Sequence, residues 1–431
     1  MRADLRALVF TLVALFYVAA GTYKASHFST DMIPVYAGAS CILHSCNPYA
    51  PPQLVEQYLA AKGNPKFVGP GHGLTAVYPP STLLALSPLA FFHYRAASVI
   101  WALLGGSALV VATGMVLWAT AKDPSWVPTV LASIILILGD GLLGMGNPAT
   151  FACALAVIGT MLFLIGRYVP LGAVLLTLSL AVKPQVAGLI IVYLLVRGVG
   201  RRWAALSLAG GFAFLMAGIL VLEMHPASRN WLPSLRANLA ECVMPGRVND
   251  PTPANPQVGL TNLQTLTSVF LANPKAWSAA ALGIALVLFV LWLAVLRKLE
   301  SGVPNHFLAL PPLLVWSLFP VYHRSCDALI LLLSFPMIVT VLRGRKVLGA
   351  CIAVLTALPF LSDAFIFPIH RIIGRFWNLQ ALLSHKLLFI LLMRPWSLEL
   401  LALFVLYLVA MRTLPAGDRL GSAQLQPAIS A

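Results

Sequence analysis

Acidic residues are rare in this sequence, and one of them stands close to the end of the first apolar run. The chain has 13 Asp and Glu among 431 residues, and Asp31 follows the run that begins near residue 5. A carboxylate at the end of a membrane helix lies at the interface, where it can ionise close to lipid head groups. The stretch STDM also suits a helix cap, because Ser, Thr and Asp are favoured there. Both interpretations of Asp31 stay open.

A second polar cluster occurs in the stretch HRSCD. Asp327 follows His323 by four residues and Arg324 by three, and side chains at these spacings meet on a helix. The cluster can be a local ion pair. A histidine in such a cluster is also a candidate proton acceptor, because imidazole titrates near neutral pH.

Lys183 stands between two apolar runs in SLAVKPQVAGLII. An ion near membrane depth is costly and usually has a partner, which favours a functional role. The simpler interpretation is a helix boundary, since a residue before proline tends to leave the helix. No set of His, Cys and Glu has zinc spacing, and no serine nucleophile motif or phosphate-binding loop occurs. We therefore expect neither a metal nor a cofactor.

The composition identifies the elements that must hold these residues. Hydrophobic residues make up 60% and charged residues 10% of the chain, against roughly 25% charged in soluble domains. Apolar stretches recur throughout and approach the roughly 20 residues that cross a bilayer as a helix. The sequence therefore predicts an all-α polytopic membrane protein.

The net charge of +15 does not indicate a nucleic-acid partner. Lys and Arg occur singly or in short clusters between apolar runs, without a basic arm or interleaved aromatic residues. Membrane topology and the phosphates of membrane lipids explain the charge better. Cys41 and Cys46 share one loop and can pair if that loop faces an oxidising compartment.

The short basic loops predict the orientation in the membrane. Placing them all in the cytoplasm requires about twelve crossing helices with both termini inside. The expected spans are 5–23, 96–119, 126–139, 149–165, 169–182, 186–197, 203–222, 276–296, 307–321, 327–342, 347–362 and 396–411. A single membrane domain over 1–431 then has a first outer loop at 24–95, a second at 223–275 and a cytoplasmic tail at 412–431.

Three apolar segments are too short to cross, at 80–95, 259–272 and 379–393. We interpret them as half-helices on the outer side. Irregular backbone at membrane depth is tolerated only where it is buried in protein or lines a wet cavity. The three segments therefore indicate an outer cavity.

Several motifs follow one another in an order known from one family. NPYAPP, YPPSTLL, GNPATF, KPQ, NLQTL and PVYHRSCD occur along the chain in that order. Over roughly residues 30–330 the arrangement resembles glycosyltransferase family 87, the polyprenyl-phosphate-mannose-dependent mannosyltransferases of the GT-C superfamily. Two motifs depart from the family pattern: Met145 stands where Gln is common, and Gln264-Thr265 replaces an N-Q-S pattern.

The resemblance implies a GT-C-like membrane enzyme that transfers a hexose, expected to be mannose, from a polyprenyl-phosphate sugar to a lipid or glycan acceptor. It implies inversion at the anomeric carbon without a metal, on the extracytoplasmic face of a bacterial inner membrane. It also makes Asp31 the catalytic acid position.

The other expected site residues follow from their chemistry and from the resemblance. His323 is an alternative base or a relay, and Lys183 and Arg324 are candidates to bind the donor phosphate. The residues expected at the sugar or acceptor site are Tyr78, Asn147, Gln185, Asn262 and Asp327.

Two other functions compete with this prediction. A transporter or lipid flippase also carries ionisable groups in the membrane, but it often has internal repeats, and none is convincing here. Long outer loops opposite minimal inner ones suit chemistry on one face better than alternating access. A non-catalytic partner in cell-envelope assembly is the third possibility, and it predicts that nothing depends on Asp31.

Overall fold

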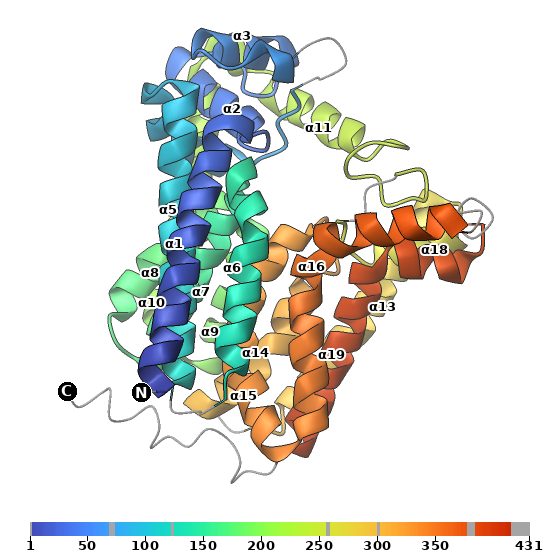
Figure 1. The fold of residues 1–431 in the computed structure, drawn as a ribbon. Helices are drawn as coiled ribbons and strands as arrows, with labels where there is room; N and C mark the ends of the chain where they lie inside the picture. Colours follow the sequence, from blue (N-terminus) through green and yellow to red (C-terminus); the bar gives the residue numbers. More distant parts are fainter. Residues whose placement is uncertain are drawn as a thin grey trace. The chain divides into compact units, whose positions relative to one another are not determined.

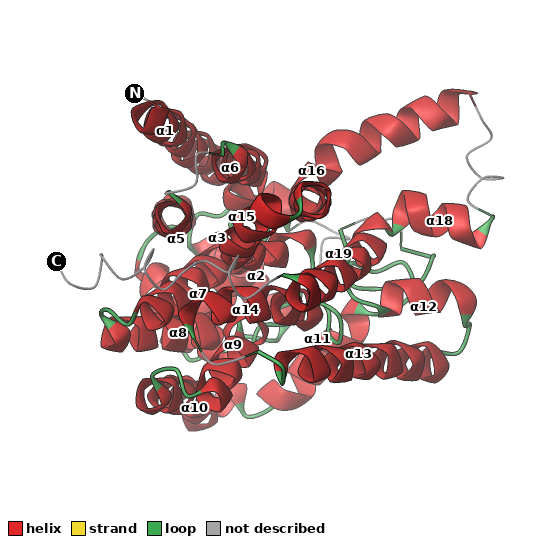
Figure 2. Cartoon of the chain, turned by 90° about the horizontal axis from the view of Figure 1, so that it is seen from below, coloured by secondary structure: helices red, strands yellow, loops and turns green. Residues whose placement is uncertain are grey.

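The protein is helical throughout the residues that the structure describes. The computed structural model describes residues 2–68, 74–121, 125–255, 259–299, 302–376 and 384–414. Within these ranges, helices are joined by loops, and the one β-type pairing is a single bridge between Leu260 and Arg324 (Figure 2). Eight of the described helices are long and apolar enough to cross a membrane. The prediction of an all-α polytopic membrane protein is confirmed.

The helices occur in the following order. They are α1 (Arg2–Phe28), α2 (Ile33–His44), α3 (Pro51–Ala60), η1 (Pro65–Phe67), α4 (Pro80–Leu86), η2 (Ser87–Phe91), α5 (Tyr94–Thr120), α6 (Val127–Met145), α7 (Pro148–Ile165), α8 (Val169–Val182), α9 (Pro184–Arg197), α10 (Arg201–Met224), η3 (Pro226–Ser228), α11 (Trp231–Cys242), α12 (Gln264–Phe270), α13 (Pro274–Leu296), α14 (Val303–Ser317), η4 (Ser325–Ser334), α15 (Phe335–Gly344), α16 (Lys346–Phe376), α18 (Lys386–Met393) and α19 (Pro395–Thr413). Each expected span lies on a helix over most of its length, although the span 307–321 extends past the end of α14 at Ser317 and α16 continues well past residue 362.

Several of the expected crossings are shorter than a bilayer. Helices α8 and α9 have 14 residues each, which is about 21 Å of helix against roughly 30 Å of hydrocarbon. The count of about twelve crossings and the cytoplasmic position of the termini therefore stay predictions. Residues 415–431, most of the expected cytoplasmic tail, lie outside the described residues.

The three segments expected not to cross contain short helices. Helices α4 and α12 have 7 residues each and α18 has 8. Pro79 precedes α4 with extended backbone, and Pro80 occupies the first turn, where the missing N–H has no helical partner to lose. Residues 379–383 of the third segment lie outside the described part of the chain. The depth of these helices in the membrane stays a prediction.

The chain divides into two compact units, each built from distant parts of the sequence (Figure 1). The N-terminal unit comprises Thr11–Ala112 and Gly139–Val243. The C-terminal unit comprises Met1–Phe10, Thr113–Leu138 and Met244–Ala431. The two units are therefore not successive domains along the chain.

Close helix packing organises the N-terminal unit. Helix α8 packs between α7 and α10, and α10 also packs on α4. Small residues allow the backbones to approach: a Cβ added at Gly218 of α10 would lie 2.7 Å from the carbonyl carbon of Pro80. Helix α2 packs on α3, α4 and η2, and its Tyr36 ring meets Tyr94 edge-on at 5.2 Å between ring centroids. These contacts fix the segment between α1 and α5, which was predicted to be the first outer loop, on the helices.

The C-terminal unit is centred on α14, which packs against α19, η4 and α13. Helix η4 is a 3-10 helix of 10 residues, whereas 3-10 runs longer than three or four residues are uncommon and often occur at functional positions. It begins directly after Arg324.

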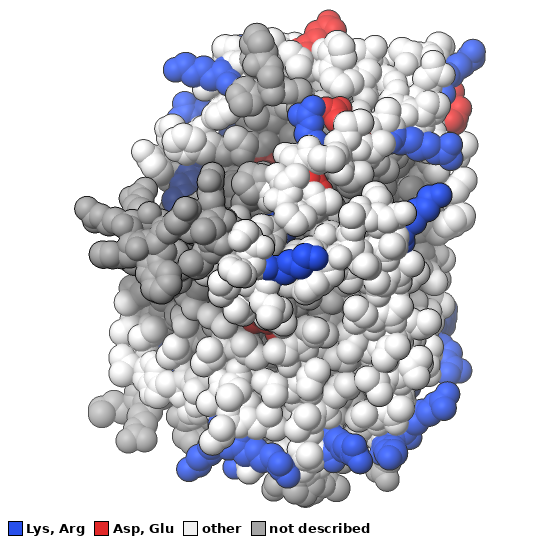
Figure 3. All heavy atoms as spheres, turned by 90° about the vertical axis from the view of Figure 1, so that its right-hand side faces the viewer, with Lys and Arg blue, Asp and Glu red and all other residues white. Residues whose placement is uncertain are grey.

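The outer surface of several helices is apolar. Large side chains such as Leu220 of α10 and Leu286 of α13 are exposed. On the face drawn in Figure 3, acidic and basic side chains are sparse across the middle, and Lys and Arg gather along the lower edge. A surface of this kind suits contact with lipid, where charged side chains are costly.

The close contact between α4 and α10 should contribute to stability. Gly218→Ala places a methyl group against the Pro80 backbone, which must shift, and overpacking of this kind costs about 1–3 kcal/mol. We expect a lower apparent unfolding temperature in detergent. Gly283→Ala in α13 is the matched control, because no atom lies within 4 Å of its added Cβ. Equal unfolding temperatures for the two variants would contradict the close packing.

Candidate functional site

Asp31 lies in the turn between α1 and α2, held against the turn that joins α6 to α7. Its N–H donates to the carbonyl of Met145 at 3.0 Å. Its Oδ2 accepts a hydrogen bond from Nδ2 of Asn147 at 2.8 Å. The side chain is half-buried. Asn147, which was expected at the sugar or acceptor site, therefore contacts the expected catalytic carboxylate directly.

The helix-cap interpretation of Asp31 is not supported. Met32 is the N-cap of α2, and no side chain makes a capping hydrogen bond there. The Asp31 carboxylate instead bonds to a residue 116 positions away in the sequence. Its other oxygen, Oδ1, makes no hydrogen bond with the described residues. This oxygen is available to a ligand.

Asn147 has two partners that fix the orientation of its amide. Its Oδ1 accepts the N–H of Ala149 at 2.9 Å and caps α7. Its Nδ2 must then face the Asp31 carboxylate, which can only accept when ionised. Gly146, just before it, has φ +73°, and an added Cβ there would collide with Ser29 and Met32. The GMGN turn thus presents an amide donor to Asp31, although Met145 replaces the Gln common in the family pattern.

Lys183 stands at the break between α8 and α9, where it is both the C-cap of one helix and the N-cap of the next. The prediction that Lys183 marks a helix boundary is therefore confirmed. Thr82 of α4 ties this junction to the YPP segment, because its hydroxyl donates to the carbonyl of Val182 at 2.8 Å. Lys183 and Gln185 are half-buried, and the function of their side chains stays a prediction.

The α7–α8 hairpin brings Asn147 and Lys183 to the same end of the N-terminal unit. Asn147 begins α7 and Lys183 ends α8. Near this end, the Ser179 hydroxyl donates to the carbonyl of Ala152 at 2.7 Å. Met32 and Val182, the neighbours of Asp31 and Lys183, belong to one buried apolar cluster. Asp31, the candidate base, and Lys183, the candidate cation, are therefore each next in sequence to a residue of the same buried apolar cluster.

Tyr78 is positioned through its backbone. The hydroxyl of Tyr49 donates to the Tyr78 carbonyl at 2.8 Å. Burial raises the pKa of Tyr49, so its hydroxyl keeps the proton that it donates. The half-buried Tyr78 side chain stays a predicted sugar contact.

In the C-terminal unit, His323 and Asp327 form a buried pair. His323 Nδ1 lies 2.8 Å from Asp327 Oδ2, and each side chain is 1% exposed. The contact expected from their spacing is confirmed. Because an ionised carboxylate only accepts hydrogen bonds, the Nδ1 atom carries a hydrogen, and in the neutral ring Nε2 is then an acceptor. Asp327 thus orients the ring and fixes its tautomer.

Asn262 is brought beside His323 by an extended segment. The N–H of Thr261 donates to the carbonyl of His323 at 3.2 Å, and the N–H of Ser325 donates to the carbonyl of Gly259 at 3.0 Å. Ser397 of α19 holds the same segment, since its hydroxyl donates to the Asn262 carbonyl at 3.1 Å. Residues far apart in the sequence therefore meet at this position.

Three buried polar atoms of this group have no hydrogen-bond partner among the residues that the structure describes: His323 Nε2, Asn262 Oδ1 and Thr261 Oγ1. Leaving a buried polar atom unpaired costs about 1–3 kcal/mol, so such a group marks a place for a ligand or an ordered water. Asn262 Oδ1 can only accept, and His323 Nε2 accepts when the imidazole is neutral. Hydroxyl groups supply the donors that these atoms lack, whereas an ionised phosphate does not. The group therefore suits a polyol such as a sugar.

Arg324 has protein partners on two sides. Its Nε donates to the hydroxyl of Tyr322, and one terminal nitrogen donates to the carbonyl of Val248 at 3.1 Å. The guanidinium group therefore braces the loop that precedes α12. Its expected phosphate contact stays a prediction.

Arg394 and Asp250 form a buried centre that the sequence analysis missed. Arg394, fully buried, donates to the carbonyls of Thr252 and Asn255 at 3.0 and 2.8 Å. Asp250, also fully buried, accepts the N–H of Gly246 at 2.7 Å. Burial lowers the pKa of Arg394 to about 10, and the Asp250 charge opposes this shift. The sequence did contain a signal for this centre: Arg394 is a single charged residue close to two apolar runs, LLFILLM and WSLELLALF. The same kind of pattern singled out Lys183.

Loss of the Arg394 guanidinium should destabilise the C-terminal unit. Arg394→Met leaves the carbonyls of Thr252 and Asn255 without this donor, and an unpaired buried polar group costs about 1–3 kcal/mol. The Asp250 carboxylate also loses the nearby positive charge. We expect a clearly lower apparent unfolding temperature. Arg412→Met is the matched control, because this Arg is exposed at the other end of α19. A variant at position 394 as stable as this control would show that the buried contacts contribute nothing.

Comparison with known proteins identifies the family. The family model of glycosyltransferase family 87 matches residues 76–310, more than half of the chain. No curated protein and no solved structure matches. The matched range contains Tyr78, Asn147, Lys183, Gln185 and Asn262, while Asp31 and the His323 group lie outside it. The chain belongs to glycosyltransferase family 87 and is a membrane glycosyltransferase, as the order of its motifs predicted.

Proposed function

We propose that the protein transfers a hexose, with mannose the expected sugar, from a polyprenyl-phosphate sugar to a lipid or glycan acceptor. The reaction takes place on the extracytoplasmic face of a bacterial inner membrane. The observation that carries the proposal is the Asp31 carboxylate, oriented by Asn147 at 2.8 Å and with Oδ1 open to a ligand. It lies directly after the first long apolar helix.

The proposed chemistry uses this carboxylate as the general base. Oδ1 accepts the proton of an acceptor hydroxyl while the hydroxyl oxygen attacks the anomeric carbon and the bond to the polyprenyl phosphate breaks. General-base assistance of this kind contributes about 10²–10⁴-fold to the rate. The transition state has oxocarbenium character, so a nearby negative charge also stabilises it. A single displacement inverts the configuration at the anomeric carbon.

Lys183 is the proposed contact for the departing phosphate. It immediately precedes α9, whose N-terminus is the positive end of the helix dipole. Pro184 has no N–H and the N–H of Val186 donates to the Lys183 carbonyl at 3.0 Å, so the N–H of Gln185 is the backbone donor that remains in the first turn. An ammonium group beside this donor suits a phosphate. Gln185, in the first turn of α9, is a neutral hydrogen-bond donor close to Lys183 in the sequence and is proposed to bind the same ligand. The reaction is expected to need no metal.

His323 and Asn262 are proposed to bind hydroxyl groups of a sugar, and Asp327 is proposed to contribute to this site by orienting the His323 ring. The support is the set of unpaired acceptor atoms in the C-terminal unit, described above. In this role, His323 Nε2 accepts a hydrogen bond from a hydroxyl rather than removing its proton in the rate-limiting step. In this assignment, Asp31 accepts the proton of the attacking hydroxyl, whereas His323 binds a sugar hydroxyl.

Asp31→Asn should leave the protein folded and abolish transfer, with a loss of at least about 10²-fold. The amide keeps the shape of the side chain but cannot accept the hydroxyl proton. The assay uses purified protein and a panel of polyprenyl-phosphate sugars, with and without EDTA. Glu56→Gln is the control, because Glu56 is an exposed acid of the same outer loop. Full activity of the Asp31 variant would remove this residue from the mechanism, and strict dependence on a divalent ion would argue against this class of reaction.

His323→Gln should act mainly on substrate binding. We expect KM to rise about tenfold, the loss typical of one hydrogen bond, while kcat changes much less. Asp327→Asn should shift KM in the same direction, because the ring loses its fixed tautomer. Separate determination of kcat and KM tests this. A collapse of kcat at unchanged KM would instead identify His323 as the proton acceptor.

A further inference from the structure

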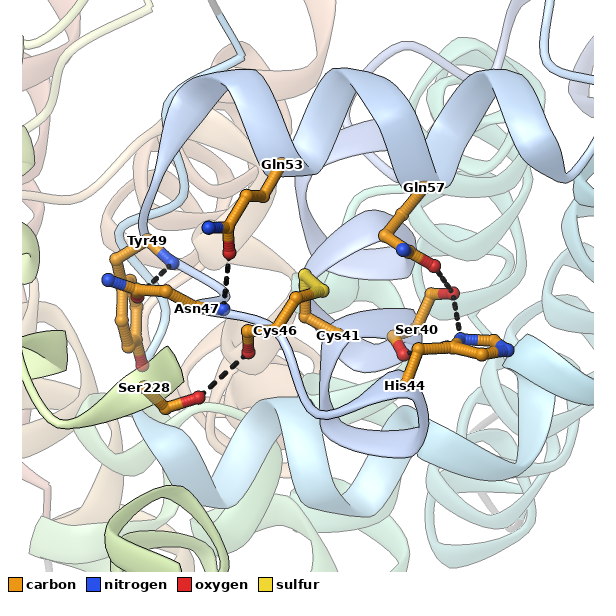
Figure 4. The surroundings of a disulfide bond; sticks show 9 residues. All are labelled: Ser40, Cys41, His44, Cys46, Asn47, Tyr49, Gln53, Gln57 and Ser228. Atoms are coloured by element: carbon orange, nitrogen blue, oxygen red, sulfur yellow. Dashed lines mark hydrogen bonds between the residues drawn. A yellow bond between two sulfur atoms is a disulfide. The ribbon is translucent and has the colours of Figure 1, made fainter. Parts of the chain in front are cut away.

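Cys41 and Cys46 are joined by a disulfide in the first outer loop (Figure 4). The bond links the last turn of α2 to the segment that follows it. Between the two cysteines, Ser45 has φ 58°, a left-handed conformation that disfavours residues other than glycine. The cross-link therefore holds a tight reversal that the local sequence does not itself favour.

The carbonyl of Cys46 is the first connection from this reversal to the second outer loop. It accepts a hydrogen bond from the Ser228 hydroxyl at 2.8 Å, and Ser228 is fully buried in η3. Figure 4 shows this bond beside the disulfide. The two cysteines and Ser228 all belong to the N-terminal unit.

Asn47, the next residue, makes further connections. Its N–H donates to Gln53 Oε1 at 2.6 Å, and its Nδ2 donates to the Ser234 hydroxyl of α11 at 3.2 Å. Its Oδ1 accepts the N–H of Tyr49 at 3.0 Å. The segment after the disulfide thus holds both η3 and α11.

The same network continues to the segment that carries Tyr78. Asn238 of α11 donates to the carbonyls of Tyr49 and Ala76 at 3.0 and 2.9 Å. These bonds need Asn47 and Tyr49 at fixed positions, and a covalent link at Cys46 reduces the number of conformations that this segment can adopt. The disulfide is therefore placed to order three separate segments.

We propose that Cys41–Cys46 is a native disulfide, formed by exchange with a disulfide-donating oxidant outside the cytoplasm, and that it keeps η3 and α11 docked on the first outer loop. The two thiols lose two protons and two electrons, and the disulfide of the oxidant is reduced to two thiols. Cys46 is half-buried, so one sulfur is within reach of exchange. The proposal does not depend on the sugar donor or on Asp31.

Thiol counting tests the covalent bond. Full-length protein in membranes is alkylated with a maleimide mass tag before and after reduction under denaturing conditions. We expect two additional tags after reduction in the wild type and in Cys351→Ser, a control that removes an exposed cysteine outside the bond, and none in the Cys41→Ser/Cys46→Ser variant. The same number of tags before and after reduction in the wild type would overturn the proposal.

Limited proteolysis tests the docking. Arg229 and Arg236 are exposed cleavage sites on either side of the Ser234 contact. Trypsin should cleave the double serine variant, and folded wild type treated with a dithiol, about tenfold faster here, because local opening becomes easier. Ser228→Ala should also speed cleavage with the disulfide intact. Wild-type cleavage rates in both the variant and the reduced protein would show that the disulfide does not hold α11.

Discussion

A polar group inside an apolar protein needs a hydrogen-bond partner, and this constraint organises both units. Asp31 has Asn147, His323 has Asp327, and Asp250 has the loop fixed by Arg394. In each case one partner is orientated by a second contact, such as the Asn147 cap on α7. Since an unpaired charge is far more costly in these surroundings than in water, such pairs are specific features of the fold.

These polar groups concentrate where helices end. Asp31 follows α1, Lys183 separates α8 from α9, and Arg394 separates α18 from α19. Helix ends leave N–H and C=O groups without helical partners, so they already require side chains or loops that supply donors and acceptors. Arg394, for example, donates to loop carbonyls directly before α19 begins. Short or interrupted helices therefore create the polar positions at which the candidate site residues Asp31 and Lys183 lie.

The helices and the Asp31 position could be predicted because they depend on local signals. Apolar runs, prolines and single charges between runs located the helix ends, and the spacing of His323 and Asp327 predicted their contact. The partner of Asp31 could not be derived in this way, since the contact with Asn147 depends on how α6 and α7 turn. Asp250 and Ser397 were missed because neither lies in a local pattern: each becomes significant only through Arg394 or Thr265.

The hydrogen-bond donors and acceptors of the candidate residues distinguish a phosphate-binding role from a hydroxyl-binding role better than their charges do. Arg324 has the appropriate charge for a phosphate, but its guanidinium is bound to Tyr322 and Val248. Beside it, Asn262 Oδ1 is an unpaired acceptor, and so is His323 Nε2 in the neutral ring; a hydroxyl can donate to both, whereas an ionised phosphate cannot. We therefore infer that the C-terminal unit recognises sugar hydroxyls. In the proposed mechanism, the phosphate then depends on the Lys183 ammonium group and on the donors of Gln185 at the start of α9.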